Sequence, residues 1–182
     1  MKIKNIAIIM ATIVCAIATP LVTSSCSSSD EPDDKPVTDR VVTSVDFTYT
    51  LVFNADMLAA YNISITYTDG SDMGTTETVT SSNWTRTVHA RQVPATFIHT
   101  VSLTPKPGIN PNREYTLLTD IEYVYNALNK HGQTVVSKEH SGSVATYGLK
   151  GEYIAGRANL LSNWLSEKYV VDANGDVKQG FY

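Results

Sequence analysis

The chain has 182 residues, 42% of them hydrophobic, with 14 basic and 18 acidic side chains and a formal net charge of −4. This acidic balance, without a cluster of Lys and Arg, argues against a nucleic-acid-binding surface. Both cysteines, Cys15 and Cys26, precede the region that we expect to fold. The folded domain is therefore predicted to rely on a hydrophobic core and not on disulfides.

The first 25 residues have the features of an export signal. The apolar run Ile6–Ala18 follows a short basic segment, and its length suits a signal peptide better than the roughly 20 residues that span a bilayer. Two processing routes are open: cleavage after the A-x-A sequence Ala16–Ala18, or lipidation of Cys26 after the small residues Thr23–Ser25. We expect lipidation, which leaves 12 basic and 18 acidic residues in a mature chain of charge −6.

An acidic, serine-rich segment follows Cys26. Residues 27–35 (SSSDEPDDK) contain four carboxylates and no apolar side chain, so they cannot bury enough surface to offset chain entropy. We predict that residues 26–40 form a solvated tether. The order of cysteine, serines and acidic cluster resembles the cell-surface lipoproteins of Bacteroidota, over residues 1–36. This resemblance implies acylation of Cys26 and location on the outer face of the outer membrane.

The body of the chain, residues 41–150, is predicted to be mainly β. Apolar and polar residues alternate with a period of two in four segments, a fifth carries Phe97, Val101 and Leu103, and a sixth is rich in Val, Thr and Ser; no helical pattern appears before residue 150. Turn signals, such as Asp69-Gly70 and the proline-rich loop 105–111, separate these segments. The predicted strands cover 43–53, 63–67, 84–90, 97–103, 115–125 and 134–147. Strands of this length and spacing indicate an antiparallel sandwich.

The order of elements between Leu103 and Tyr147 narrows the fold class. A strand that ends in Leu103 is followed by a proline loop, a strand that begins at Tyr115, a turn that contains Asn129, and a strand rich in Ser and Thr. This order resembles strands E, F and G of fibronectin type III and related Ig-like domains. The resemblance implies an Ig-like or fibronectin III-like β-sandwich.

After Gly151 the period of the apolar residues changes to that of a helix. Four of them recur at i, i+4, i+7 and i+11: Ile154, Ala158, Leu161 and Leu165. This stripe predicts an amphipathic helix over 152–167, with Trp164 beside the stripe. Since a short helix is marginal alone in water, we expect the stripe to cover an open end or face of the sandwich.

The last segment, Tyr169–Tyr182, contains both a turn signal and oxygen ligands. Asn174-Gly175 lies between valines and predicts a terminal β-hairpin. Asp172, Asn174 and Asp176 alternate like the start of a calcium loop, but Val177 stands where such a loop needs glycine. We therefore expect a hairpin turn and no metal, in a C-terminal unit of residues 151–182 packed on the sandwich. The turn at Asp69, Ser71 and Asp72 has the same interpretation.

Two sets of titratable residues could serve an enzyme, which is the alternative to a binding module. Asp120 and Glu122 share the polar face of the strand 115–125, the minimum that a paired-carboxylate hydrolase needs. The four histidines show no metal-ligand spacing: His89, His99, His131 and His140. The predicted domain contains no nucleophile motif and no phosphate-binding loop. We expect no catalysis and no cofactor, and keep a small hydrolase or metal-dependent enzyme as the alternative.

Aromatic side chains are the remaining candidates for binding. Among ten tyrosines and two tryptophans, Trp84 in the polar sequence TSSNWTRT and Tyr61 are expected to be partly exposed and to bind a ligand. We expect a non-catalytic surface module, held to the membrane by lipid on Cys26, that binds a glycan or an envelope protein and no nucleic acid. A surface assembly subunit that accepts a neighbour's strand at a sheet edge is a further alternative. The sequence leaves the oligomeric state open.

Overall fold

The computed structural model describes residues 40–68 and 74–181. The predicted signal peptide, Cys26 and the tether up to residue 39 lie outside the described residues, as does the predicted turn at Asp69-Gly70. All of the described residues belong to a single unit of the chain, Val37–Tyr182.

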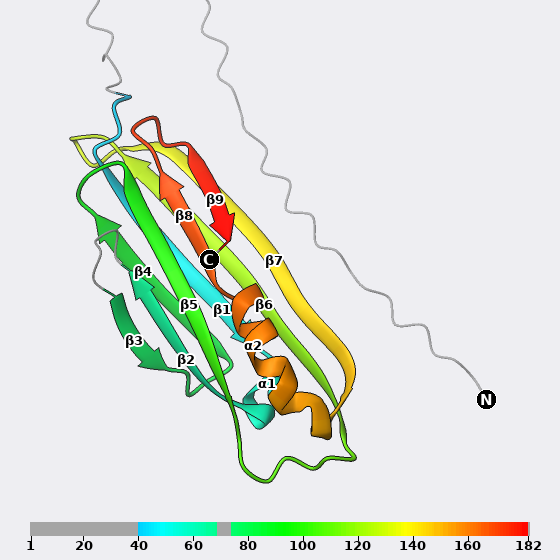
Figure 1. Cartoon of the computed structure of the whole chain (residues 1–182). Coiled ribbons are helices and arrows are strands. Elements are labelled where there is room, and N and C mark those ends of the chain that lie inside the picture. The colour runs from blue at the N-terminus through cyan, green and yellow to red at the C-terminus, as the bar shows by residue number, and fades with distance from the viewer. Residues whose placement is uncertain (1–39, 69–73, 182) are drawn as a thin grey trace, which may run out of the picture. The chain divides into compact units, whose positions relative to one another are not determined.

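Strands of the described residues form two antiparallel sheets (Figure 1). The first sheet has the order β4 (Asn83–Ala90), β1 (Ser44–Phe53), β6 (Glu114–Leu128) and β7 (Thr134–Lys150). The second has the order β3 (Gly74–Thr78), β2 (Tyr61–Thr68), β5 (Ala95–Pro105), β8 (Glu167–Val171) and β9 (Val177–Phe181). The helical elements are α1 (Ala55–Ala60), the 3₁₀ turn η1 (Gly151–Tyr153) and α2 (Ile154–Trp164). The predicted β-sandwich with one C-terminal helix is therefore confirmed.

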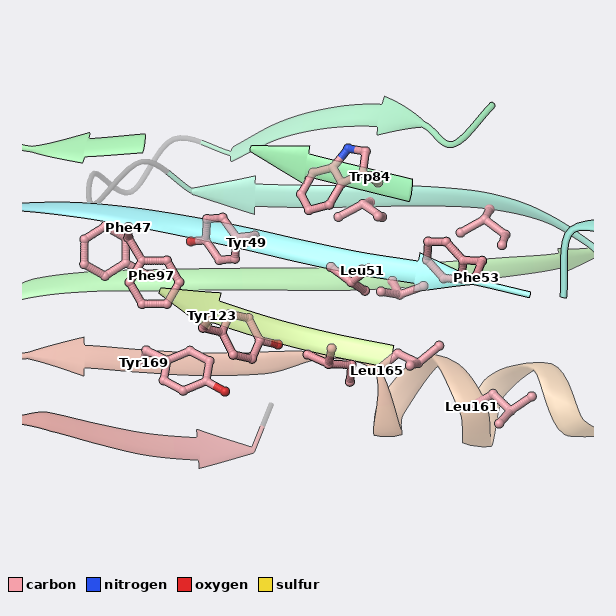
Figure 2. Close-up of a cluster of buried hydrophobic side chains, with 14 of the residues drawn as sticks. Phe47, Tyr49, Leu51, Phe53, Trp84, Phe97, Tyr123, Leu161, Leu165 and Tyr169 are labelled. Atoms are coloured by element: carbon pink, nitrogen blue, oxygen red, sulfur yellow. The ribbon is translucent and has the colours of Figure 1, made fainter. Parts of the chain in front are cut away.

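The core lies between the inner faces of the two sheets, and β1 shows how alternation builds it. Phe47, Tyr49, Leu51 and Phe53 are buried, whereas the residues between them face outward. Aromatic rings from both sheets meet here (Figure 2), and Phe47 stacks on Phe97 of β5 with ring centroids 4.5 Å apart. Rings of this size bury much apolar surface, which stabilises the domain without a disulfide.

Part of the strand order matches an immunoglobulin-like sandwich, but the strands that match are not the ones predicted from the sequence. In an immunoglobulin sandwich strand B lies between A and E, and strand F lies between C and G. Here β1 lies between β6 and β4, and β5 lies between β2 and β8. If β1 stands for strand B, then β4, β5 and β8 occupy the places of E, F and G. The segments predicted as F and G are instead β6 and β7, which extend the first sheet on the side of strand A.

Two short elements were missed by the sequence prediction. α1 has only six residues, and its first turn is capped by the Asn54 side chain, which accepts a hydrogen bond from the Met57 N–H at 2.9 Å. β3, with the sequence GTTET, is an edge strand without an apolar alternation. α1 is too short and β3 is too polar to be recognised from the sequence, because pattern analysis needs several periods of apolar residues.

α2 takes the place of a strand along β5 (Figure 1). The first half of β5 pairs with β8, from Ala95↔Val171 to His99↔Glu167. Beyond this pairing, the N–H groups of Val101 and Leu103 donate to the hydroxyls of Ser166 (2.9 Å) and Ser162 (3.2 Å) instead. The last turn of the helix and the residues just after it thus satisfy backbone donors that a strand would otherwise pair.

The predicted stripe of α2 is confirmed as its buried face: Ile154, Ala158, Leu161 and Leu165 are at most 4% exposed. They cover the gap between the sheets where β8 and β9 do not reach. The helix itself is shorter than predicted, ending at Trp164 rather than at residue 167. Neither helix of the described residues has the length and apolarity needed to cross a membrane.

The predicted terminal hairpin is also confirmed, as β8 and β9 pair in antiparallel register. Gly175 has a φ of +79°, the left-handed conformation that the Asn-Gly signal predicted. The Asp172 carboxylate accepts hydrogen bonds from the N–H groups of Asn174 (2.8 Å) and Asp176 (3.0 Å). The oxygen-rich segment therefore serves the turn.

Candidate functional site

The two aromatic residues expected to be partly exposed are both buried. Trp84 is 4% and Tyr61 is 1% exposed, so the expected exposure was wrong. The polar neighbours of Trp84 in β4 point outward, and the tryptophan is the residue that alternation turns inward. Tyr61 packs beneath the helix, where its hydroxyl donates to the Ile154 carbonyl at 2.8 Å. Neither ring offers a free face for stacking a ligand.

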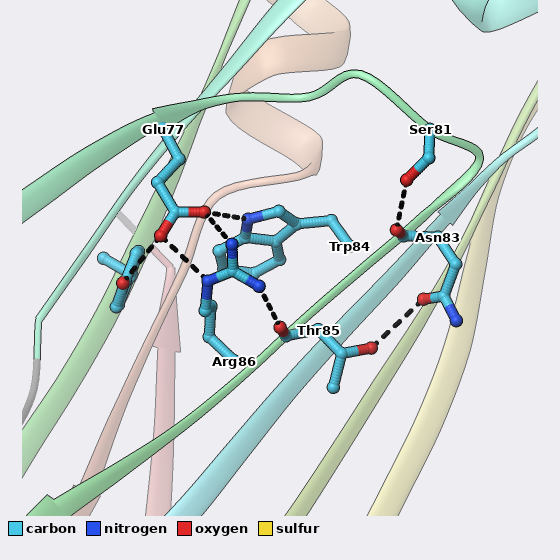
Figure 3. Close-up of polar contacts among 7 residues, drawn as sticks. Glu77, Ser81, Asn83, Trp84, Thr85 and Arg86 are labelled. Carbon is cyan, nitrogen blue, oxygen red and sulfur yellow. Dashed lines mark hydrogen bonds and ion pairs between the residues drawn. The ribbon is translucent and has the colours of Figure 1, made fainter.

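Trp84 belongs to a polar network that closes one side of the sandwich (Figure 3). Glu77 of β3 accepts hydrogen bonds from the Trp84 indole N–H (3.1 Å), the Tyr67 hydroxyl (3.0 Å) and the Arg86 guanidinium (2.5 Å). The Arg86 guanidinium, aided by the Trp84 and Tyr67 donors, lowers the pKa of Glu77 to about 2. Because β3 and β4 belong to different sheets, this carboxylate ties the two sheets together.

The candidate carboxylate pair lies on the outer face of the first sheet. Asp120 and Glu122 are exposed and line a shallow hollow with Ser141 and Ser143 of β7. They share a face, as predicted, and no histidine lines this hollow. The position gives no enclosure that would exclude water from a reacting bond.

The four histidines lie at separate places in the domain. His89 contacts Asp46 on the outer face (2.5 Å), His131 lies exposed in the β6–β7 turn, and His140 stacks on Tyr123 with centroids 6.4 Å apart. His99 is fully buried. In the described part of the chain, no three His, Cys, Asp or Glu side chains gather in a way that could hold a metal ion.

His99 belongs to a buried polar cluster at the β5–β8 junction. Its Nε2–H donates to the Leu165 carbonyl at 2.6 Å, and burial lowers its pKa to about 4, so the ring is neutral at pH 7. Tyr169 donates to Glu167, and burial with the nearby Glu167 carboxylate raises the pKa values of Tyr169 and Tyr123. These groups are fixed hydrogen-bonding partners that orient β8 against the core.

Exposed aromatic side chains occur instead on the outer face of the C-terminal helix. Tyr153, Arg157, Leu160 and Trp164 recur at i, i+4, i+7 and i+11, and we call them the outer stripe. Tyr153, Leu160 and Trp164 are 57%, 36% and 44% exposed. The Arg157 guanidinium lies 5.2 Å from the centroid of the Trp164 ring, within cation–π range. Three of the four side chains are exposed and Arg157 is half-buried among them, and the row lies next to the buried stripe on the same helix.

The outer stripe stands on a rigid support. Gly151 lies so close to the loop before β6 that a Cβ atom there would be 2.0 Å from the Asn110 carbonyl oxygen. Together with the Tyr61 hydroxyl bond and the Ser162 and Ser166 bonds to β5, this contact fixes both ends of the helix. Side chains on a fixed helix lose little further backbone freedom on binding, which favours recognition.

The sequence prediction missed the outer stripe, although its signal is visible. The sequence prediction placed Trp164 beside the apolar stripe. It did not identify the second helical row to which Trp164 belongs, or the exposed aromatic side chains of that row. That row starts at Tyr153, in the 3₁₀ turn, and has the same spacing as the buried row. Exposed large apolar side chains are the informative deviation on a helix surface.

The fold and the site define the class of the molecule: an antiparallel β-sandwich that carries an aromatic helix face. No protein-family model matches the chain, and neither a curated protein nor a solved structure does. Its function is therefore argued from its own residues.

Proposed function

We propose that this protein is a lipid-anchored, non-catalytic module of the bacterial outer membrane that faces the cell exterior and binds an envelope protein through its outer stripe. The anchor is argued from the sequence alone: an export signal, Cys26 after small residues, and an acidic tether. The binding role is argued from the exposure of Tyr153, Leu160 and Trp164 on a fixed helix, which is the observation that carries the proposal.

The chemistry of the stripe favours a protein partner over a glycan. Trp, Tyr and Arg are the residues that most often dominate the energy of protein interfaces. An amphipathic helix with anchors at i, i+4 and i+7 fits a hydrophobic groove on a partner. Leu160, in the middle of the row, adds apolar area that a sugar ring with its hydroxyls would not use. We infer a partner with an apolar groove and an acidic rim that meets Arg157.

The non-catalytic part of the proposal has support in the placement of the titratable groups. Asp120 and Glu122 are exposed on an open face, and His99 is buried and held by a backbone carbonyl. Catalytic groups need mutual geometry around a site that excludes water. The described carboxylates and histidines are held in other arrangements.

The test of binding is site-specific photo-crosslinking in the native envelope. A photoreactive residue at Leu160 is expected to form an adduct with one protein. The same residue at Val52, which is 37% exposed on the outer sheet face, serves as the matched control and should form none. Trp164→Ala should cost about 2 kcal/mol, or roughly 30-fold in affinity, and reduce the Leu160 adduct accordingly. Equal adducts from both positions, or an adduct with carbohydrate, would refute the protein-binding role.

The anchor has a separate test, so that the two parts of the proposal can fail independently. Cys26→Ala should move the protein from the membrane fraction to the soluble fraction, because the acyl chains hold it in the bilayer at about 0.8 kcal/mol per buried CH₂. Mass spectrometry of the mature N-terminus should show a lipidated Cys26. An unmodified N-terminus upstream of Cys26, or membrane retention of the variant, contradicts the anchor.

A further inference from the structure

The two long sides of the sandwich differ in how the gap between the sheets is closed. On the β3–β4 side, Glu77, Trp84 and Arg86 bridge the sheets with short hydrogen bonds. On the other side, where β7 and β9 are the outermost strands, Lys138 reaches Asp176 at 3.7 Å. Next to this loose contact the structure leaves a slot between the sheets.

The slot is a cavity of about 160 Å³ with aromatic walls, open to solvent at one side. Its lining comes from both sheets: Phe47, Tyr123, Tyr125, Lys138, Glu139, His140, Tyr169 and Val177. Several wall rings are near parallel, with 7° between Phe47 and Tyr125 and 15° between Tyr123 and His140. Well-packed interiors have few voids larger than a water molecule, and an apolar cavity of about 150 Å³ is large enough for a benzene ring.

The register of β7 places basic side chains at the mouth of the slot. Lys138 pairs with Tyr125 and His140 pairs with Tyr123, and residues directly opposite each other in a sheet share a face. Lys138 and His140 therefore point toward the gap between the sheets, and Glu139 between them also borders the slot. Inward-pointing charges also protect an edge strand from pairing with other chains. A protective role alone would not require an open aromatic slot beside them.

We propose that this slot is a binding site for a single aromatic ring that carries a carboxylate. The ring would enter between Tyr125, Tyr169 and Val177, and stack on the wall rings. The carboxylate would remain at the mouth, where the Lys138 ammonium is half exposed and only loosely held by Asp176. The site is separate from the outer stripe, and it does not depend on the function proposed for that helix face.

The test is a titration of the full-length protein with phenylacetate, followed by NMR of labelled tyrosines. We expect saturable shifts of Tyr123, Tyr125 and Tyr169 at concentrations up to about 10 mM, where millimolar affinity is measurable. Lys138→Ala should weaken binding about fivefold, and 2-phenylethylamine, with the charge reversed, should bind at least about fivefold more weakly. Lys178→Ala is the matched control, because Lys178 follows Val177 in β9 and points to the opposite face.

Variants that fill the slot complete the test. Val177→Leu and Val177→Phe add increasing volume at a partly exposed position in the lining, so they should weaken phenylacetate binding in that order. If Val177→Phe does not fold, Val177→Leu still reports the trend. Four results would overturn the proposal: no saturable shifts, unchanged binding in the folded filling variants, equal binding of the amine, or an equal loss in Lys178→Ala.

Discussion

The two stripes of α2 should respond to mutation in opposite ways, and the pair Leu161→Ala and Trp164→Ala tests this. Leu161 is 1% exposed in the gap between the sheets, whereas Trp164 is 44% exposed and contacts Arg157. Truncation of a buried leucine costs about 2–5 kcal/mol, because transfer energy is lost and a cavity remains. Truncation of the exposed tryptophan removes a cation–π contact worth about 0.5–1 kcal/mol.

The assay is thermal and urea unfolding of both variants beside the parent protein. For a domain of this size, a loss of about 3 kcal/mol lowers Tm by about 10 °C, so Leu161→Ala should melt well below the parent. Trp164→Ala should melt within about 3 °C of it. The Leu160 photo-crosslink should respond in Trp164→Ala, which keeps its fold. A similar loss of stability in both variants would refute the separation of a structural face from a binding face.

Two further predictions concern acid stability. Burial lowers the pKa of His99 in the folded protein to about 4, whereas the unfolded chain keeps the ordinary 6.5. The neutral His99 ring therefore stabilises the fold fully above pH 6.5, and this stabilisation is lost as the pH falls toward 4. In urea unfolding between pH 7 and pH 4, the parent protein should lose on the order of 3 kcal/mol more of its free energy of unfolding than His99→Gln. If the free energies of parent and variant fall in parallel with pH, this prediction is wrong. The folded pKa of Glu77 is about 2, below 4.5, so its contribution is present above pH 4.5 and declines as the pH falls toward 2. Glu77→Gln should flatten this decline, and its effect at pH 7 should shrink in about 1 M salt because Glu77 and Arg86 are partly exposed. A salt-independent effect would contradict an ionic role for Glu77.

The network around Glu77 shows why the predicted exposure of Trp84 failed. In the sequence, Trp84 has polar residues on both sides, which suggests a wet position. In β4 those neighbours include Thr85 and Thr87, which pair with Thr50 and Thr48 on the outer face. The alternation of a strand permits a buried residue between exposed ones, and only the position of Glu77 in the other sheet provides a partner for the indole N–H.

The outer stripe and the slot both depend on elements distant in sequence. The stripe is exposed because the neighbouring row of α2 is the one that packs toward β5, which lies about 60 residues earlier in the chain. The slot combines residues of β1, β6, β7, β8 and β9. The spacing of the stripe is visible in the sequence, but a helical row of large side chains can be buried or exposed according to what packs on it. The slot has no local signature, because its residues come from five strands.

The sequence by itself determined the periodicities: the alternating strands, the apolar stripe of the C-terminal helix and the Asn-Gly hairpin, because each follows from local geometry and the burial of one face. The tertiary structure alone decided which strands are neighbours, which aromatic rings reach solvent and where the gap between the sheets remains open. Those features depend on pairing and packing between distant segments, which a period of two or 3.6 does not encode.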